Sequence, residues 1–358
     1  MSKIIPSPDQ NQLDNISARR YISPVKQNGN RPTRSKIEAS YVSKNGILFR
    51  ADCLDMLANI RENTVDLAFV DPPFNLGKEY NTDFSDEMET EAYRSWCRAW
   101  LSELTRVLRP GGALFLYHWP RWLMEIGAWL NTLPALEYKS WIALKMKSGF
   151  PIRSRIHPAH YGLLYYVKRG ARPTFNVVRH KSPTCRHCGG LVRDYGGYRK
   201  KFEKFEDDEG VPWVQISDFW EDTRPARQDK SRELQINELP LHIPERAILM
   251  ASNPGDVVLD CFVGGGSTLQ AAHMHDRLWI GGELGEPVAA LQRIATFIGE
   301  AETNKPSQRL LSCFTDSQQL ALKTSVNGHK RPISAVGKIG EVSGSMDKFA
   351  SKSKVIGF

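Results

Sequence analysis

The sequence of 358 residues contains no run of about eighteen apolar residues, and its first residues, MSKIIPSPDQNQ, lack the apolar stretch of a signal peptide. Cysteine is scarce, with six in the whole chain. Most of the cysteines lie inside expected helices and strands, which is typical of a reducing compartment and not of a disulfide framework. These absences predict a cytoplasmic protein that does not use a membrane.

The charge of the chain is unevenly distributed. The net charge is +8, which is modest for this length. Between residues 139 and 202, however, fifteen Lys or Arg accompany a single acidic residue, Asp194, and residues 203–209 then carry five acids. A segment of one sign and this length indicates a surface that faces phosphates. A solvated basic face without a partner is the alternative.

Apolar strands and amphipathic helices alternate through most of the chain, and 41% of its residues are hydrophobic, which is ample for a core. Strands are expected at residues 46–52 and 65–70, in ALFLYHW, WIALKMK and YGLLYYVK, and later in DVVLDCF and RLWIGGE; a long helix is expected at residues 90–108. This alternation predicts an α/β fold with a doubly wound, mostly parallel sheet. Ligands of such sheets bind beyond the carboxyl ends of the strands, where the polar motifs of this chain fall.

The tetrad Asp71-Pro72-Pro73-Phe74 directly follows the strand VDLAFV. The exocyclic amino group of a nucleobase is a poor nucleophile, because its lone pair is delocalised into the ring. Acceptors for its two hydrogens favour the tetrahedral geometry that attack requires. Asp71 offers a carboxylate, Pro72 a carbonyl whose direction two prolines restrain, and Phe74 a flat face for stacking. An ordinary turn that ends a strand is the alternative.

A glycine-rich turn, CFVGGGST, follows the later strand that ends at Asp260. Glycines let backbone amides and a helix N-terminus approach a ligand closely. The order is Asp260-x-Phe262-x-Gly264-x-Gly266-x-Thr268, which differs from the Gly-x-Gly-x-x-Gly of dinucleotide-binding turns. Glu283 ends the next strand, where a carboxylate can accept two ribose hydroxyl hydrogen bonds. A tight turn without a ligand is the alternative.

Taken in this order, the two motifs resemble those of DNA amino-methyltransferases of the N6-adenine/N4-cytosine family, in the permuted (beta) class, whose catalytic motif precedes the cofactor motif. The resemblance covers about residues 46–298. It implies a Rossmann-like fold and S-adenosylmethionine as cofactor, and it extends to Pro240 and Arg246 in the helix before the cofactor strand. The implied cofactor residues are Asp52, Pro240, Asp260, Phe262, Gly264, Gly266, Thr268 and Glu283. The chain departs from the family pattern at Glu238-Leu239, Cys261 and Gly265, where Gln-Lys, Pro and Ser are usual.

The resemblance implies that double-stranded DNA is the substrate and that the target base is flipped out of the duplex. Asp71 favours adenine N6, because cytosine-N4 enzymes more often have Ser at this position; cytosine N4 stays the alternative. Cytosine-C5 chemistry would need a Cys after a Pro at this strand end, and none is there. Methylation of a protein or small amine and a non-catalytic DNA-binding module are further alternatives. A homodimer and a cognate restriction endonuclease are partners that the resemblance suggests.

Composition and resemblance together divide the chain into five parts: a polar arm (1–40), a catalytic half (41–168), a target-recognition insert (169–232), a cofactor-binding half (233–303) and a polar tail (304–358). The residues expected to contact DNA are Arg153, Arg155, Arg193, Arg199 and Lys200. Cys185 and Cys188 form a single CxxC pair within the insert. Two free thiols in a turn are favoured there over a structural zinc site, for which His180 or His187 could add a third ligand.

Overall fold

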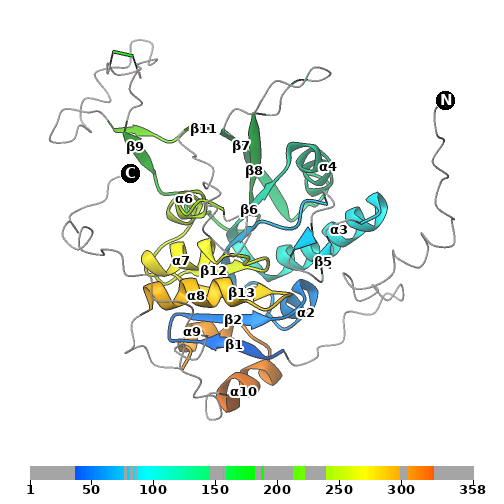
Figure 1. Ribbon diagram of the computed structural model, residues 1–358, viewed down its shortest axis with the longest axis vertical. Helices are drawn as coiled ribbons and strands as arrows, with labels where there is room; N and C mark the ends of the chain where they lie inside the picture. The colour runs from blue at the N-terminus through cyan, green and yellow to red at the C-terminus, as the bar shows by residue number, and fades with distance from the viewer. Residues whose placement is uncertain are drawn as a thin grey trace, which may run out of the picture.

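The computed structural model describes residues 37–75, 79–80, 84–85, 88–145, 156, 159–181, 187–188, 213–221, 239–298 and 305–325. One sheet of nine strands organises these residues (Figure 1). Its strands run in the order β1 (Ala39–Val42), β2 (Gly46–Arg50), β13 (Leu278–Glu283), β12 (Val257–Asp260), β3 (Val65–Val70), β6 (Leu108–His118), β8 (His160–Lys168), β7 (Leu136–Lys145) and β11 (Phe219–Trp220).

The five central strands, from β2 to β6, are parallel to one another. Strand β1 is antiparallel at one side, and β8 is antiparallel to both β6 and β7 at the other. The predicted doubly wound, mostly parallel sheet is therefore confirmed. Two short ribbons lie apart from it: β4 (Glu79–Tyr80) pairs with β5 (Phe84–Ser85), and β9 (Arg179–Lys181) pairs with β10 (Trp213–Gln215).

Helices cover both faces of the sheet, as Figure 1 shows. Helices α6 (His242–Ala251), α7 (Ser267–Met274) and α8 (Val288–Phe297) bury their apolar side chains in one hydrophobic core. Helices α2 (Cys53–Ala58), α3 (Thr90–Val107) and α4 (Pro120–Leu130) bury theirs in the core on the opposite face. None of the helices in the described ranges is both long and apolar enough to cross a membrane.

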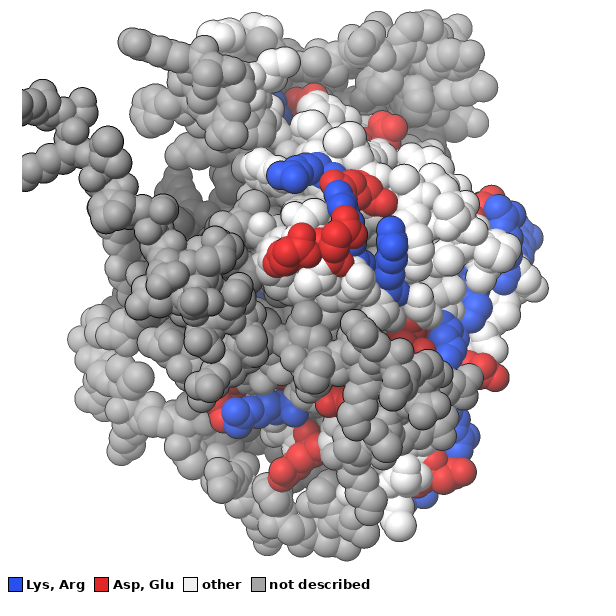
Figure 2. Space-filling view, turned by 90° about the vertical axis from the view of Figure 1, so that its right-hand side faces the viewer, with Lys and Arg blue, Asp and Glu red and all other residues white. Residues whose placement is uncertain are grey.

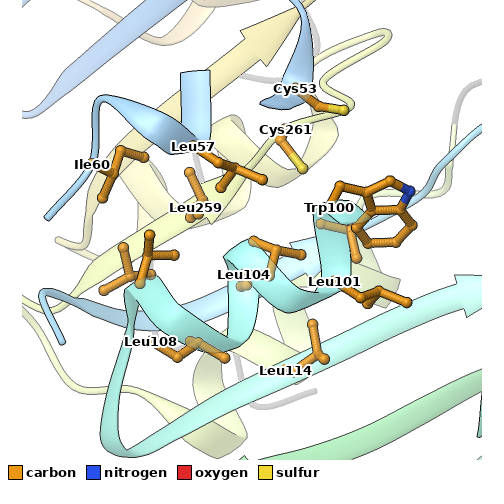
Figure 3. Packing of buried hydrophobic residues seen from close by; sticks show 14 of the residues in the cluster. Cys53, Leu57, Ile60, Trp100, Leu101, Leu104, Leu108, Leu114, Leu259 and Cys261 are labelled. Atoms are coloured by element: carbon orange, nitrogen blue, oxygen red, sulfur yellow. The ribbon is translucent and has the colours of Figure 1, made fainter. Parts of the chain in front are cut away.

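Helix α3 agrees with the predicted helix to within one residue at its C-terminus. Its buried side chains recur every three or four residues, as expected for a helix with one apolar face. Figure 3 shows Leu104 of this helix on the side of Leu259 of β12 and Leu57 of α2, and Leu101 on the side of Leu114 of β6, all within one core. Helix α3 therefore shares one hydrophobic core with β12, the strand that leads into the glycine-rich turn.

The structure differs from the predicted boundaries at both ends of the domain. Strand β1 begins at Ala39, inside the predicted polar arm, and helices α9 (Gln308–Ser312) and α10 (Asp316–Ser325) lie inside the predicted polar tail. Apolar side chains explain the second difference, since Leu310, Leu311, Cys313, Phe314 and Leu322 are buried in the same core as α3. These side chains at the start of the predicted tail are therefore part of the core of the domain.

Candidate active site

Strand β3 carries the tetrad to the carboxyl edge of the sheet. All six residues of β3 are buried, so the strand is held from both faces. Of the residues that follow it, Pro72 is buried, whereas Asp71, Pro73 and Phe74 are half-buried. The buried strand fixes the position of these residues, while the partial exposure of Asp71, Pro73 and Phe74 leaves them accessible to a ligand.

Asn75 closes the segment after the tetrad. Its backbone lies in the left-handed region, at φ 54°, which Asn tolerates better than most residues. Its amide group donates from Nδ2 to the carbonyl of Met88 at 3.1 Å, and its Oδ1 accepts from the Met88 N–H at 2.6 Å. The two ends of the segment 75–88 are therefore fixed to each other immediately before α3 begins.

Aromatic side chains surround Phe74. Its ring centroid lies 5.8 Å from that of Tyr117 and 5.9 Å from that of Tyr161, and the two tyrosine rings are 5.2 Å apart. Burial, followed by the negative charge of Asp71, raises the pKa of both tyrosines above the usual range. Asp71 and these rings thus share one aromatic-walled surface, which is able to hold a flat group beside a carboxylate.

The sequence did not single out Tyr117 and Tyr161. The available signal was their position at the ends of two apolar strands, β6 and β8, because β6 is the neighbour of β3. Their proximity results from the antiparallel pairing of these strands, in which Tyr117 lies opposite Leu163.

Three carboxylates line the neighbouring part of the same edge. Asp52 follows β2, Glu283 ends β13 and Asp260 ends β12, and these three strands are adjacent in the sheet. Burial raises the pKa of Asp260 to about 7, and the nearby charge of Glu283 also raises it. Burial likewise raises the pKa of Glu283 and of Asp52. Water is largely excluded from this corner, so a ligand that donates hydrogen bonds or carries positive charge is favoured.

The glycine-rich turn is held by two of these carboxylates. The Gly264 N–H donates to Oε2 of Glu283 at 2.8 Å, and the Phe262 N–H donates to Oδ1 of Asp260 at 2.9 Å. Gly264 and Gly266 have φ of 50° and 82°, a region that other residues rarely adopt. A Cβ on Gly266 would lie 3.3 Å from Cα of Ala290, whereas a Cβ on Gly264 would meet open space. The turn therefore packs closely on α8 at one glycine and is open at the other.

Side chains from other elements support the turn. The ring of Phe262 makes edge contacts with Trp96 and Trp100 of α3, at centroid distances of 5.6 and 5.1 Å. Thr268 is buried and hydrogen-bonds Asp260. The Pro240 carbonyl accepts from the Ile243 N–H at 3.0 Å as α6 begins.

Ser267, which the sequence did not single out, donates from its hydroxyl to the Leu239 carbonyl at 2.8 Å. This bond attaches the segment before α6 to the first residue of α7. Figure 3 also shows Cys53 and Cys261, the residues directly after Asp52 and Asp260. Both thiols are buried beneath the carboxylate corner, and burial raises the pKa of each.

The tetrad and the glycine-rich turn lie at the same edge of the sheet. Strands β3 and β12 are parallel neighbours, with Ala68 opposite Leu259. The predicted tetrad residues and the predicted cofactor residues therefore come from adjacent strand ends, although nearly two hundred residues of chain separate them.

The residues predicted to contact DNA, namely Arg153, Arg155, Arg193, Arg199 and Lys200, lie outside the described residues, as does Cys185. Cys188 is an exposed free thiol. Within the described ranges, no three His, Cys, Asp or Glu side chains gather as a metal site would require. The prediction that this CxxC pair holds two free thiols and not a structural zinc ion stays untested, because Cys185 is outside the described residues. On the face in Figure 2, described Lys and Arg are interspersed with Asp and Glu, so no patch of one sign is visible there.

Comparison with known proteins defines the class. Residues 65–292, which are more than half of the chain, match the DNA methylase family, and the chain belongs to this family. It is 42% identical over 250 residues to the type II methyltransferase M.BamHI of Bacillus amyloliquefaciens, a match that covers 70% of this chain and 57% of that protein. It is also 27% identical over 275 residues to the DNA adenine methyltransferase YhdJ of Escherichia coli (strain K12), covering 72% and 82% of the two chains.

Among solved structures, the cytosine-N4-specific PvuII DNA methyltransferase has a TM-score of 0.53 and 14% sequence identity, with 83% of this chain and 98% of that chain covered. This likeness confirms the methyltransferase fold of the domain.

Proposed function

We propose that this protein transfers a methyl group from S-adenosylmethionine to the exocyclic amino nitrogen of a base in DNA. One observation carries the proposal: Asp71 and its aromatic surface end the strand next to β12, whose end carries the glycine-rich turn and Asp260. A base on the first and a methyl donor on the second would meet at one sheet edge, and bringing two reactants together in a fixed geometry is a large part of catalysis. Membership of the DNA methylase family supports the same reading.

The residues at the carboxylate corner fit S-adenosylmethionine. The open space beside Gly264 admits a ligand close to the backbone. Glu283 suits ribose hydroxyls, Asp260 and Phe262 suit the methionine end, and Asp52 suits the adenine side. When bound, the cofactor supplies an electrophilic methyl group on a sulfonium sulfur.

The tetrad would prepare the amino group for attack. The Asp71 carboxylate and the Pro72 carbonyl accept the two amino hydrogens and so favour a tetrahedral nitrogen with its lone pair directed at the methyl group. Phe74, Tyr117 and Tyr161 hold the ring of the base. Transfer would then be direct and in line, without a covalent enzyme intermediate: the bond from nitrogen to the methyl carbon would form as the carbon–sulfur bond breaks, S-adenosylhomocysteine would leave, and the methylated nitrogen would lose its proton to water.

The target base has to leave the duplex to reach Asp71, so the substrate would be double-stranded DNA with one nucleotide flipped out. We assign sequence recognition to the basic insert, residues 169–232, between a catalytic half (41–168) and a cofactor-binding half (233–303). Arg153, Arg155, Arg193, Arg199 and Lys200 would contact phosphates. A homodimer and a cognate restriction endonuclease stay predictions.

Two bases share this chemistry. Asp71 at the first tetrad position favours adenine N6, and YhdJ is named as an adenine methyltransferase. Cytosine N4 is the second candidate, because the fold relative from the PvuII system is cytosine-N4-specific. Both amino groups would bind to Asp71 and Pro72 in the same way.

Nucleoside mass spectrometry of DNA incubated with the protein and S-adenosylmethionine tests the proposal. We expect N6-methyladenine or N4-methylcytosine to accumulate, and the identity of the product decides between the two bases. Absence of any methylated base on several unmodified DNAs, with cofactor binding shown separately, would contradict the proposal.

The affinity for S-adenosylmethionine should depend on pH near neutrality. The pKa of Asp260 is about 7 in the ligand-free protein, so its carboxyl is mostly protonated at pH 6. A ligand ammonium group prefers the ionised form, and affinity should therefore rise roughly tenfold for two pH units across that pKa. Calorimetry at pH 6.0 and 7.5 should show tighter binding at the higher pH together with proton release.

The stability of the ligand-free protein should change in the opposite direction. The pKa of Asp260 is raised from 3.8 to about 7, so the folded protein binds more protons than the unfolded chain between these values. This contribution to stability is present below about pH 4 and is lost as pH rises through 7. Asp260→Asn is the control for both trends. Cofactor affinity that depends equally on pH in this variant and in the wild type would assign the titration to another group.

A further inference from the structure

Two buried polar side chains lie directly behind the tetrad. His118 ends β6 and is fully buried, and Tyr93 lies in the first turn of α3 with 1% of its surface exposed. Neither belongs to the tetrad or to the glycine-rich turn. Buried polar groups are costly unless they are hydrogen-bonded, so the partners of these two residues indicate why they are there.

A row of hydrogen bonds runs from the backbone through both side chains to the tetrad. The Trp119 N–H donates to Nδ1 of His118 at 2.7 Å, so this ring nitrogen carries no proton. Burial lowers the pKa of His118 to about 3, which keeps the ring neutral with its proton on Nε2. Nε2 lies 2.6 Å from the Tyr93 hydroxyl, which lies 2.5 Å from the Pro73 carbonyl. Since Nε2–H must donate to the hydroxyl, the hydroxyl donates to Pro73.

The same imidazole also supports the next residue. The ring of Phe74 stacks on His118 with a centroid distance of 4.6 Å and an interplanar angle of 23°. Through Tyr93 and directly, His118 thus holds the Pro73 carbonyl and the Phe74 ring at once. Fixing a carbonyl and the ring of the following residue leaves the peptide between them little freedom to rotate. Asn75 then anchors the far side of the same segment to Met88.

We propose that Tyr93 and His118 are positioning residues that orient the tetrad, so that the Pro72 carbonyl, the Asp71 carboxylate and the Phe74 ring meet the flipped base in a reactive geometry. Neither residue touches the base or the cofactor. Their effect is on the alignment of the acceptors with the amino hydrogens, and a misplacement of about 1 Å is enough to slow such reactions a hundredfold. The inference rests on the proposed methyl transfer to an amino group.

A role in stability alone is the competing explanation, because a buried Tyr–His pair also helps to pack α3 on the sheet. The two explanations differ in which quantity changes. Loss of alignment lowers kcat for methyl transfer while cofactor binding at the glycine-rich turn is unchanged. Loss of packing lowers stability and leaves the kcat of the folded fraction unchanged.

Tyr93→Phe is the direct test, because it removes the hydroxyl and keeps the ring. We expect kcat for methyl transfer to fall roughly tenfold, as for one lost hydrogen bond of the stronger kind. The Kd for S-adenosylmethionine should stay within about twofold. Tyr166→Phe is the matched control: Tyr166 is equally buried, and its hydroxyl donates to Oδ1 of Asn131 at 2.9 Å, between β8 and α4. We expect this control to retain wild-type kcat.

His118→Phe and the double variant complete the design. Phe at position 118 keeps a flat ring under Phe74 but cannot hydrogen-bond Tyr93. If Tyr93 and His118 act through the same row of hydrogen bonds, kcat of the double variant should be no lower than kcat of the more strongly affected single variant. Wild-type kcat in Tyr93→Phe, or an equal loss in Tyr166→Phe, would overturn the proposal.

If the wild-type protein methylates no DNA, the proposed function is refuted. The row of hydrogen bonds can still be tested in that case, by a measurement that does not depend on activity. Nitrogen-15 spectra of His118 should show a protonated Nε2 whose shift moves in Tyr93→Phe. An unchanged shift would overturn the row itself.

Discussion

Asp71→Ala is expected to lower kcat for methyl transfer by about a hundredfold to a thousandfold, as the loss of one preorganised polar group at a reacting centre does in other enzymes. The carboxylate is the only charged acceptor of the tetrad, and its negative charge raises the pKa of buried Tyr117 and half-buried Tyr161. Without it, the amino group keeps one acceptor, the Pro72 carbonyl. Radiolabelled methyl transfer under single-turnover conditions measures the effect.

Two further variants sharpen this test. Asp71→Asn keeps an acceptor oxygen without the charge, so its kcat should lie between the wild type and Asp71→Ala. Asp316→Ala, on α10, removes an exposed carboxylate that pairs with Arg61 and should leave kcat unchanged. Cofactor affinity should be the same in all three. Full activity in Asp71→Ala would exclude the proposed chemistry, even if the protein methylates DNA.

Asp66→Ala is expected to cause the largest loss of stability, about 3 kcal/mol in the free energy of unfolding, because it leaves the buried Val257 N–H without its acceptor and removes the carboxylate that pairs with two half-exposed arginines. The Asp66 side chain is 5% exposed. It accepts from Arg109, from Nη2 of Arg309 at 2.8 Å and from the Val257 N–H at 2.8 Å. One carboxylate therefore joins the starts of β3, β6 and β12 to helix α9.

Urea unfolding, which measures the free energy of unfolding, tests this prediction. Glu286→Ala is the control, because it removes an exposed partner of Arg50, and such pairs contribute less than about 1 kcal/mol. Asp66→Asn should lie between the wild type and Asp66→Ala, because it keeps acceptor oxygens for Val257. Equal midpoints for Asp66→Ala and Glu286→Ala would show that the arginines find other partners.

The parts of the fold that the sequence predicted are those set by local pattern. The strand before Asp71 is a continuous apolar run, and α3 has an apolar side chain at nearly every third or fourth position. The glycine-rich turn could be predicted from the spacing of its glycines, and Gly264 and Gly266 have φ of 50° and 82°, a region that Gly adopts more readily than other residues. The order of the two motifs along the chain then pointed to the family.

The parts that the sequence did not predict depend on contacts between distant segments. Tyr93 lies 25 residues before His118, and the two meet only because α3 packs over the end of β6. Tyr161 reaches the tetrad because β8 turns back antiparallel to β6. Neither contact can be predicted from a repeating pattern of residues within one helix or strand. The ion pair between Arg309 and Asp66 likewise joins residues that are 243 positions apart, so no local pattern predicts it.

The pairing of the two ends of the domain has a consequence for its synthesis. The Ile37 N–H donates to Oε1 of Gln318, and Nε2 of Gln318 donates to the Ile37 carbonyl, across 281 residues of chain. During synthesis, a growing chain that already contains both motifs still lacks Leu310, Phe314 and Leu322. The core residues that these side chains cover in the complete domain are then exposed to water. A gene cut after residue 292, where the family match ends, would yield the same incomplete chain. The proposed methyl-transfer activity would therefore appear late in translation, when helices α9 and α10 pack against the rest of the domain.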